Sequence, residues 1–521
     1  MAALPAAAGA LDGDGAADVI VVGAGIAGMS IAYELATLGQ RVMVLEAATV
    51  GGGETGRTTA HLTTALDGRY YKLERLVGQE GAALCAASHA CAISRIESIC
   101  GCESIACDFQ RVDGFLVVPP EDGVRAMELL ETERLAAQRV GVASELVRRA
   151  PFASFDSGPC LRFPGQAQFH VGKYLSGLVS AILERGGRIH TGTRVVHVHD
   201  GEAPSVTTDR GYAVSARAVV VATNSPVNDR VVMHTKQTPY RSYVIGVRAL
   251  RGILPPALIW DGFWDDHSKP YHYVRLRMDP TQEEELLVVG GEDHVTGRDD
   301  DADGRYAALE AWTRERFPNA LDVAYRWSGQ IMEPHDEVAF IGRNPGSKHV
   351  YVVTGDSGNG MTHGAIAGML IPCLLRGEDH PWKHVYSPSR LPQHAVGHAV
   401  VENAHVVAQY RDWVAPRDHT PLERLAPGAG TVVRDRLGRL RAVYKDLNSV
   451  LHWTSAVCPH LQGIVRWNAG ECSWDCPCHG SRFDCRGNVL HGPANEPLAP
   501  VQEDGPHGMA APSDGAAVTG G

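Results

Sequence analysis

Residues 18–46 read DVIVVGAGIAGMSIAYELATLGQRVMVLE and predict a strand, a glycine-rich turn, a helix and a second strand. The apolar, β-branched run near the start is typical of a buried parallel strand. Gly23, Gly25 and Gly28 follow it in the spacing G-x-G-x-x-G, and Glu46 closes the second strand. A glycine pattern alone is weak, but this order of elements predicts a dinucleotide site.

Each part of this motif has a physical task at such a site. Gly23 permits the tight turn, Gly25 lets the backbone approach a pyrophosphate, and Gly28 lets the helix pack on the strand. The start of the helix directs its N–H groups at the phosphates. Glu46 is placed to bind ribose hydroxyls, which favours FAD or NAD over NADP.

Three later stretches favour FAD. Residues 186–200 predict a short strand pair that could close over the adenine, and residues 216–228 predict another buried strand. Residues 349–371 predict a strand, a glycine-rich turn and a helix whose start, near Met361, faces an anionic flavin edge. The predicted cofactor-binding residues are Gly23, Gly25, Ile26, Ala27, Gly28, Glu46, Thr58, Thr59, Val195, Gly355, Asp356, Gly358, Gly360 and Met361.

These stretches resemble the D-amino-acid oxidase/glycine oxidase family of FAD-dependent oxidoreductases. The likeness covers about residues 18–385 and is also carried by FHVGKYLSGLVSAILERGGRI (169–189), RWSGQIMEPHDEVAFIG (326–342) and TGDSGNG (354–360). It implies an α/β, Rossmann-like FAD-binding domain interleaved with a β-sheet substrate domain. It also implies hydride removal from a C–H bond beside a nitrogen, and it places the loop 51–64 beside the flavin.

Two histidines lie near the expected flavin. His61, in the loop 51–64, is interpreted as an ordinary polar histidine, with covalent attachment of the flavin as the alternative. His363 follows the second glycine-rich turn and is interpreted as a flavin neighbour rather than a substrate contact.

The segments between the flavin segments supply the substrate candidates. Residues 238–247, 270–276 and 286–294 alternate enough to predict strands of the substrate sheet. Aromatic side chains there can enclose an amine and stabilise its cation, and an arginine can pair with a carboxylate. Ordinary aromatic pairing within a sheet is the alternative for each residue. The candidate catalytic residues are Tyr271, Tyr273, His294 and Arg241, with Tyr240, His272 and Arg275 as further candidates and no catalytic base assigned.

Near the C-terminal end, two motifs combine cysteine with histidine: Cys458-x-His460 and Cys476-x-x-His479. A zinc finger usually pairs cysteine with cysteine and histidine with histidine along the chain. Here each motif offers one sulfur and one imidazole, which suits two irons, one held by the cysteines and one by the histidines. The region resembles the Rieske [2Fe–2S] domain, with zinc as the alternative, and its short strands predict a small all-β domain.

The resemblance also predicts how this cluster differs from respiratory Rieske proteins, which add one cysteine to each loop and join the two by a disulfide. The second loop keeps its extra cysteine, Cys478, but the first has Gly463 at the partner's place, so no disulfide is expected. Ser481 could hydrogen-bond a cluster sulfur, and Phe483 stands where high-potential relatives carry a tyrosine. Fewer hydrogen bonds to sulfur place the potential toward the low end of the roughly −150 to +300 mV Rieske range.

Length and composition limit the other possibilities. The chain has 521 residues, enough for two or three domains, and a net charge of −12, which gives no general attraction to nucleic acid or anionic membranes. No apolar run is long enough to predict a membrane helix. Twelve cysteines without a predicted secretion signal indicate reduced thiols or metal ligands, and a cytoplasmic protein.

The predicted organisation is a disordered tail (1–17), the oxidoreductase (18–382), a linker (383–420), the Rieske domain (421–510) and a second disordered tail (511–521). The FAD-binding segments are about 18–75, 170–230 and 325–382, and the substrate-domain segments about 76–169 and 231–324.

We expect a small amine or amino-acid-like substrate to reduce FAD by hydride transfer. The cluster would then take electrons singly for a redox partner protein or another acceptor, because its histidine ligands raise its potential above that of all-cysteine ferredoxins. The alternative is that electrons enter through the cluster and the flavin acts as a reductase or monooxygenase. A third possibility is a structural cluster in a plain oxidase.

Overall fold

The computed structural model describes residues 9–118, 123–152, 154–228, 232–250, 252, 255–262, 271–277, 284–299, 301–391, 396–413 and 422–501. The predicted C-terminal tail, residues 1–8 of the predicted N-terminal tail, and residues 392–395 and 414–420 of the predicted linker lie outside the described residues. Among the described residues, no helix is long and apolar enough to cross a membrane.

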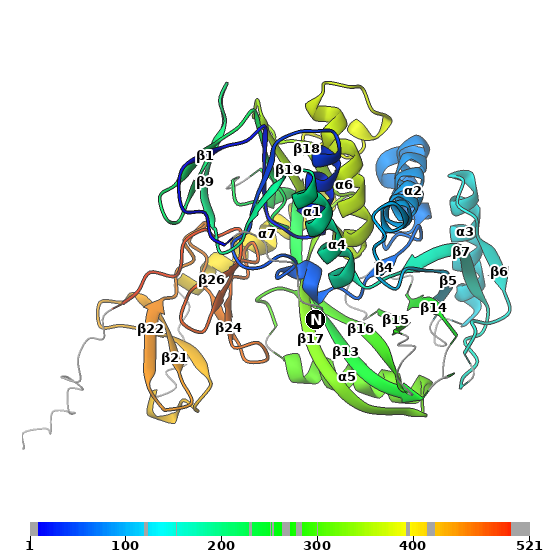
Figure 1. The fold of residues 1–521 in the computed structure, drawn as a ribbon. Coiled ribbons are helices and arrows are strands. Elements are labelled where there is room, and N and C mark those ends of the chain that lie inside the picture. The colour runs from blue at the N-terminus through cyan, green and yellow to red at the C-terminus, as the bar shows by residue number, and fades with distance from the viewer. Residues whose placement is uncertain are drawn as a thin grey trace, which may run out of the picture.

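A six-stranded sheet in the order β18-β19-β12-β2-β3-β8 forms the centre of the first domain (Figure 1). Its strands are parallel except β18, which is antiparallel to β19. Val19 and Val21 pack on the helical side of β2, whereas Ile20 and Val22 pack on the other side. The strands are β2 (Val19–Val22), β3 (Val42–Leu45), β8 (Arg188–His190), β12 (Ala218–Val221), β18 (Phe340–Arg343) and β19 (Val350–Thr354).

Helices cover one face of this sheet, where α1 packs on α4 and α6, and α2 packs on α6. Their bounds are α1 (Ile26–Thr37), α2 (Tyr70–Cys102), α4 (Val171–Glu184) and α6 (Gly360–Leu375). Short 3-10 helices are η1 (Glu54–Arg57), η3 (His234–Lys236), η4 (Ser357–Asn359) and η5 (Pro381–Lys383).

A four-stranded sheet in the order β1-β11-β10-β9 covers the opposite face. The predicted strand pair within 186–200 is wrong, because β8 joins β3 in the parallel sheet and β9 pairs with β10. The two strands separate because Ile189 packs among the helices, whereas Val195 packs between the two sheets. The strands are β1 (Gly15–Ala16), β9 (Val195–His199), β10 (Ser205–Thr208) and β11 (Ala213–Ser215).

The substrate region is one large sheet in the order β17-β13-β16-β15-β14-β5-β7-β4, with β6 paired to β7. Its strands come from segments that alternate with those of the first domain, which confirms the interleaved arrangement. The strands are β4 (His61–Leu62), β5 (Gln110–Val117), β6 (Glu145–Val147), β7 (Cys160–Gln168), β13 (Gln237–Leu250), β14 (Ala257–Asp261), β15 (His272–Arg277), β16 (Glu284–Val295) and β17 (Ala320–Pro334). The helices beside it are α3 (Gly123–Arg139) and α5 (Ala302–Arg316).

The C-terminal region is all-β, as predicted, with sheets β20-β21-β22 and β23-β24-β25-β26 around their own apolar core. Figure 1 shows these strands in orange and red beside β9 and β17. The strands are β20 (Gly430–Arg434), β21 (Leu440–Lys445), β22 (Leu451–Ser455), β23 (Arg466–Asn468), β24 (Ser473–Asp475), β25 (Arg482–Asp484) and β26 (Val489–His491). The preceding helices are α7 (Val396–Gln409), η6 (Tyr410–Trp413) and η7 (Leu422–Arg424).

Candidate functional site

A cavity of about 460 Å³ runs along the carboxyl ends of the parallel strands. Ligands of open α/β sheets bind at this edge. Of the predicted cofactor-binding residues, it is lined by Gly23, Gly25, Ile26, Ala27, Glu46, Thr58, Thr59, Val195, Asp356, Gly358, Gly360 and Met361.

The first glycine turn brings β2, α1 and β12 close together. Gly23 has a φ of +102°, and a Cβ there would lie 2.5 Å from the carbonyl oxygen of Ala222. A Cβ at Gly28 would lie 2.0 Å from the carbonyl oxygen of Gly23, so Gly28 serves helix packing and not the cavity surface. Glu46 accepts a 2.8 Å hydrogen bond from the backbone N–H of Ala24, which holds its carboxylate at the cavity wall.

Thr55, on η1, is a cavity residue that sequence reasoning missed. Its Oγ1 accepts a 3.0 Å hydrogen bond from the backbone N–H of Ile26, at the start of α1. A Cβ at Gly25 would lie 2.9 Å from the same oxygen. The loop therefore closes over the helix start that suits a pyrophosphate. The hydroxyl-rich run GETGRTT (53–59) was the sequence feature from which this residue could have been predicted.

The second glycine turn packs against two other segments. Gly355 has a φ of +71°, and a Cβ there would lie 2.7 Å from Pro334, so it lies behind the cavity wall. Gly358 faces Asp67, whose carboxylate accepts a hydrogen bond from the Gly358 N–H and leaves no room for a side chain. His363 also lines the cavity, and burial lowers its pKa to about 4, so the ring is neutral at pH 7.

Aromatic side chains form the wall nearest the substrate sheet. Tyr273 and Trp260 are cross-strand partners on β15 and β14, and both line the cavity. The Tyr273 ring covers Gly290, where a Cβ would lie 2.2 Å from the ring. The Tyr273 hydroxyl is 3.0 Å from Ser242 Oγ, and His61 packs edge-on at 5.7 Å between ring centroids. Because Gly290 has no side chain, the Tyr273 ring can lie over it and form this part of the cavity wall.

Three carboxyl groups gather at this end of the cavity: Asp67, Asp293 and Glu333, called here the cavity carboxylates. Asp67 lines the cavity directly, and Asp293 accepts hydrogen bonds from Ser242 and Tyr271, which also line it. Burial raises the pKa of Asp67, and it raises the pKa of Asp293 and of Glu333 to about 7, with repulsion among these groups adding to the last two. A cationic ligand would favour their ionised forms.

The predicted cluster ligands lie together in the C-terminal domain. The thiols of Cys458 and Cys476 are in hydrogen-bonding contact, and the rings of His460 and His479 are 5.1 Å apart. Burial lowers the pKa of His479 to about 3, as suits a neutral metal-binding imidazole, and its Nδ1 has no hydrogen-bond partner among the described residues.

Two sulfurs beside two imidazoles fit a cluster with two protein ligands on each iron. In the described ranges no three His, Cys, Asp or Glu side chains are placed to hold one ion.

The neighbours of the ligands lie where the sequence analysis expected them. A Cβ at Gly463 would lie 2.6 Å from Cys478 Sγ, so the first loop offers no sulfur to this free cysteine. Ser481 hydrogen-bonds the thiol of Cys458. Phe483 is fully buried and offers no hydroxyl to the cluster.

A family model described as FAD dependent oxidoreductase (DAO) matches residues 18–372, and a model described as Rieske [2Fe-2S] domain matches residues 419–502. The chain belongs to the DAO family of FAD-dependent oxidoreductases. It carries a Rieske domain in addition, and the two matches imply FAD and a [2Fe–2S] cluster as its cofactors.

Relatives of this FAD-dependent oxidoreductase share one or both parts. YhfW of Bacillus subtilis (strain 168), named as a Rieske 2Fe-2S iron-sulfur protein, is 30% identical over 95% of each chain. The gamma-glutamylputrescine oxidoreductase of Escherichia coli (strain K12) is 27% identical over 69% of this chain and 84% of its own. The solved glycine oxidase of Geobacillus kaustophilus has the same fold, with a TM-score of 0.61 and 18% identity over 72% of this chain and 99% of its own.

Three imidazoles meet where the Rieske domain of the oxidoreductase docks on the other domains. The His234 ring, on η3, lies 4.8 Å from the His460 ring and 5.7 Å from the His479 ring. The Gln330 side chain, which lines the cavity, donates a 3.0 Å hydrogen bond to the carbonyl oxygen of Gly480. The imidazole side of the predicted cluster therefore faces the part of the oxidoreductase that carries the cavity.

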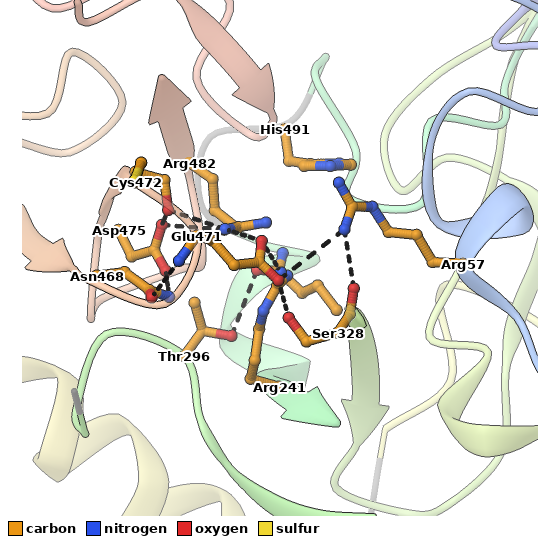
Figure 2. Close-up of polar contacts among 12 residues, drawn as sticks. Arg57, Arg241, Thr296, Ser328, Asn468, Glu471, Cys472, Asp475, Arg482 and His491 are labelled. Atoms are coloured by element: carbon orange, nitrogen blue, oxygen red, sulfur yellow. Dashed lines mark hydrogen bonds and ion pairs between the residues drawn. The ribbon is translucent and has the colours of Figure 1, made fainter. Parts of the chain in front are cut away.

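A buried charge network holds this junction together, and Figure 2 shows it. Glu471 lies between Arg241 and Arg482, whose side chains are each 1% exposed, and Asp475 lies 2.9 Å from Arg482 Nε. Burial would raise the pKa of Glu471 and of Asp475, but the two arginines hold both pKa values below their usual range. Glu471 and Asp475 are called here the junction carboxylates.

The candidate catalytic residues divide between the cavity and the junction. Tyr271 and Tyr273 line the cavity. Arg241 is paired with Glu471, and His294 Nε2 lies 3.0 Å from a tyrosine hydroxyl of β13. Their expected contact with substrate is therefore corrected: side chains alternate along β13, and Ser242 rather than Arg241 points into the cavity. The further candidates Tyr240, His272 and Arg275 also lie outside the lining residues.

Sequence reasoning missed part of the cavity lining because it comes from segments assigned to other tasks. The missed lining residues include Glu54, Thr55, Arg57, Asp67, Asn224, Ser242, Trp260, Gln330, Val489, Leu490, His491, Gly492, Ala494 and Asn495. The last six belong to the Rieske domain.

Proposed function

We propose that this oxidoreductase oxidises the C–N bond of a small amine. A neutral amine that loses the hydride beside its nitrogen becomes an iminium. Bound FAD would supply the acceptor for this electron pair, and a bound [2Fe–2S] cluster would supply single-electron transfer to an external acceptor. The side chains of the protein hold the amine, exclude water and connect the two redox sites.

The observation that carries this proposal is the short connection between the cavity and the cluster loops. Ala494 lines the cavity, and its N–H donates a 3.1 Å hydrogen bond to Ser481 Oγ. Ser481 in turn hydrogen-bonds the Cys458 thiol. Gln330 provides a second connection, through its hydrogen bond to Gly480. So close a connection supports electron transfer between the sites over a purely structural cluster.

The cavity carboxylates favour a cationic amine over an α-amino acid. An ammonium group can pair with Asp67, which lines the cavity, and lie against the faces of Tyr271 and Tyr273. The E. coli relative is named for γ-glutamylputrescine, an amine, which supports the oxidation of an amine.

The arginines near the cavity already have partners. Arg275 donates to two backbone carbonyl oxygens, at 3.2 and 3.4 Å, and Arg241 pairs with Glu471. Arg57 lines the cavity but donates a 2.9 Å hydrogen bond to the carbonyl oxygen of Ser328. A substrate carboxylate would therefore have to compete with these partners for a guanidinium group.

An anaerobic titration of the holoenzyme tests this function. Diamines, monoamines and amino acids are added in turn while flavin absorbance and the EPR signal of the reduced cluster are recorded together. We expect amines to bleach the flavin and the cluster signal to appear with it.

Two outcomes would overturn parts of the proposal. If an amine bleaches the flavin and the cluster stays oxidised, electron transfer between the sites is refuted. If turnover instead requires NAD(P)H with a reductase protein, electrons enter through the cluster.

The terminal acceptor and the cytoplasmic location remain predictions.

A further inference from the structure

A short segment of the Rieske domain, Val489–Asn495, forms part of the wall of the cavity that suits FAD. It consists of β26 and the turn after it. Val489, Leu490, His491, Gly492, Ala494 and Asn495 line the same cavity as the glycine fingerprint of the first domain. The cofactor site is thus built from both ends of the chain.

Hydrogen bonds attach this segment to the strands near the adenosine end. The Asn495 side-chain amide donates to the carbonyl oxygens of Val196, at 3.2 Å, and Val227, at 2.9 Å. Arg194, which also lines the cavity, donates a 3.0 Å hydrogen bond to the carbonyl oxygen of Val489. Both ends of the segment are therefore bound to the first domain.

A contact between an imidazole and a carboxylate joins the middle of the segment to the loop over the helix start. Burial lowers the pKa of His491, so its ring is neutral at pH 7. His491 Nε2 lies 3.2 Å from Glu54 Oε1, on η1, the same short helix that places Thr55 against the N–H of Ile26. A Cβ at Gly492 would lie 3.1 Å from a methyl group of Val227, so the backbone passes close to the first domain there. The segment crosses from the adenosine end to the pyrophosphate end of the site.

We propose that the Rieske domain completes the FAD site, with Val489–Asn495 covering the adenosine diphosphate half of the cofactor. FAD then leaves only when this segment separates from Val196, Val227 and Glu54. Because a ligand stabilises the state to which it binds, FAD also holds the Rieske domain in its docked position. This inference rests on the two cofactor domains and does not depend on the substrate or on the direction of electron flow.

Hydrogen–deuterium exchange of the full-length protein tests the inference without any substitution. The deflavinated protein that retains its cluster EPR signal is compared with the same protein after FAD is added. We expect FAD to slow exchange in peptides covering Val489–Asn495, while peptides from β21 and β22, far from the cavity, keep their rates. Equal exchange in Val489–Asn495 with and without FAD would overturn the inference.

A pair of asparagine variants tests the same point by affinity. Asn495→Ala removes both amide hydrogen bonds, whereas Asn488→Ala is a matched control, because the Asn488 side chain is exposed and bonds Asp484 within the Rieske domain at 2.8 Å. Binding is measured by the quenching of FAD fluorescence, with the cluster EPR signal as a check on folding. We expect Asn495→Ala to raise the Kd for FAD about tenfold and Asn488→Ala to leave it within twofold. Equal Kd values for the two variants would contradict the proposed cover.

Discussion

Neighbouring residues of β13 serve two groups of buried carboxylates with opposite electrostatics. Ser242 donates to Asp293, one of the cavity carboxylates, whereas Arg241 pairs with Glu471, one of the junction carboxylates. The pKa of Asp293 is raised by burial to about 7, and the pKa of Glu471 is held below its usual value against the effect of burial.

The two pKa values differ because the carboxylates have different partners. At the junction two arginines come with the carboxylates, so the charges are satisfied and the contact is structural. In the cavity, hydroxyl groups come with Asp293, and the nearby charges of Glu333 and Asp67 repel it. A site built in this way keeps its strongest interaction for a cationic ligand.

The largest effect is expected at the junction. Glu471→Ala leaves two buried arginines short of a partner, which should lower the free energy of unfolding by about 3–5 kcal/mol. Urea unfolding followed by circular dichroism measures this loss. The control is Glu310→Ala on α5, which breaks more exposed pairs with Arg314 and Arg326 and should cost less than about 1 kcal/mol. Equal losses in the two variants would remove the distinction between this junction and an ordinary surface pair.

The second largest effect is expected in the cavity, and there activity falls while stability does not. Asp67→Asn should lower kcat/KM for an amine about 100-fold, since loss of one partner of an enclosed charge pair costs about 2–5 kcal/mol. Its thermal stability should stay equal or rise, because a repelling charge is removed. The control is Asp209→Asn, at an exposed position, which should change neither quantity. An unchanged kcat/KM in Asp67→Asn would show that the cavity carboxylates do not bind the substrate.

The third effect is a dependence of stability on pH without substrate. The folded pKa of Asp293 and of Glu333, about 7, lies above the unfolded values near 4, so the folded protein keeps protons that the unfolded chain releases. Their contribution is full below about pH 4 and is lost as the pH rises to 7, by up to about 1.4 kcal/mol per pH unit for each proton. Asp293→Asn should reduce this slope in unfolding experiments between pH 4 and 7. If the variant has a slope as steep as that of the unchanged protein, the pH dependence does not come from Asp293.

The smallest effect is expected from Arg241→Lys. The variant keeps the charge beside Glu471 but loses the planar fork of the guanidinium, which should cost about 1 kcal/mol of stability. The KM for the amine should stay within twofold, because Arg241 belongs to the junction. A tenfold rise in KM would show that Arg241 contacts the substrate. It would contradict the distinction between the junction and the cavity.

Local patterns were sufficient for much of this protein. The spacing of Gly23, Gly25 and Gly28 predicted the strand–turn–helix that opens the cavity, because the close approach of Gly28 to the Gly23 carbonyl oxygen involves residues near each other in sequence. The motifs around Cys458 and Cys476 predicted the cluster loops for the same reason. The fold class followed from these motifs and their order.

Other features depended on which segments meet in space. Along β13 the sequence could not tell whether Arg241 or Ser242 points into the cavity, since alternation leaves two possible registers. The pairing of β8 with β3 was likewise decided by where Ile189 is buried and not by its neighbour strand in sequence.

The sequence by itself determined the two cofactor domains and the residue types at each redox site. The tertiary structure decided which carboxylates receive an arginine, that Ser242 rather than Arg241 points into the cavity, and that Val489–Asn495 of the last domain lines the cavity of the first. The reason is physical: a turn or a ligand motif is specified by a few adjacent residues, whereas burial and charge pairing are set by partners far away in the chain.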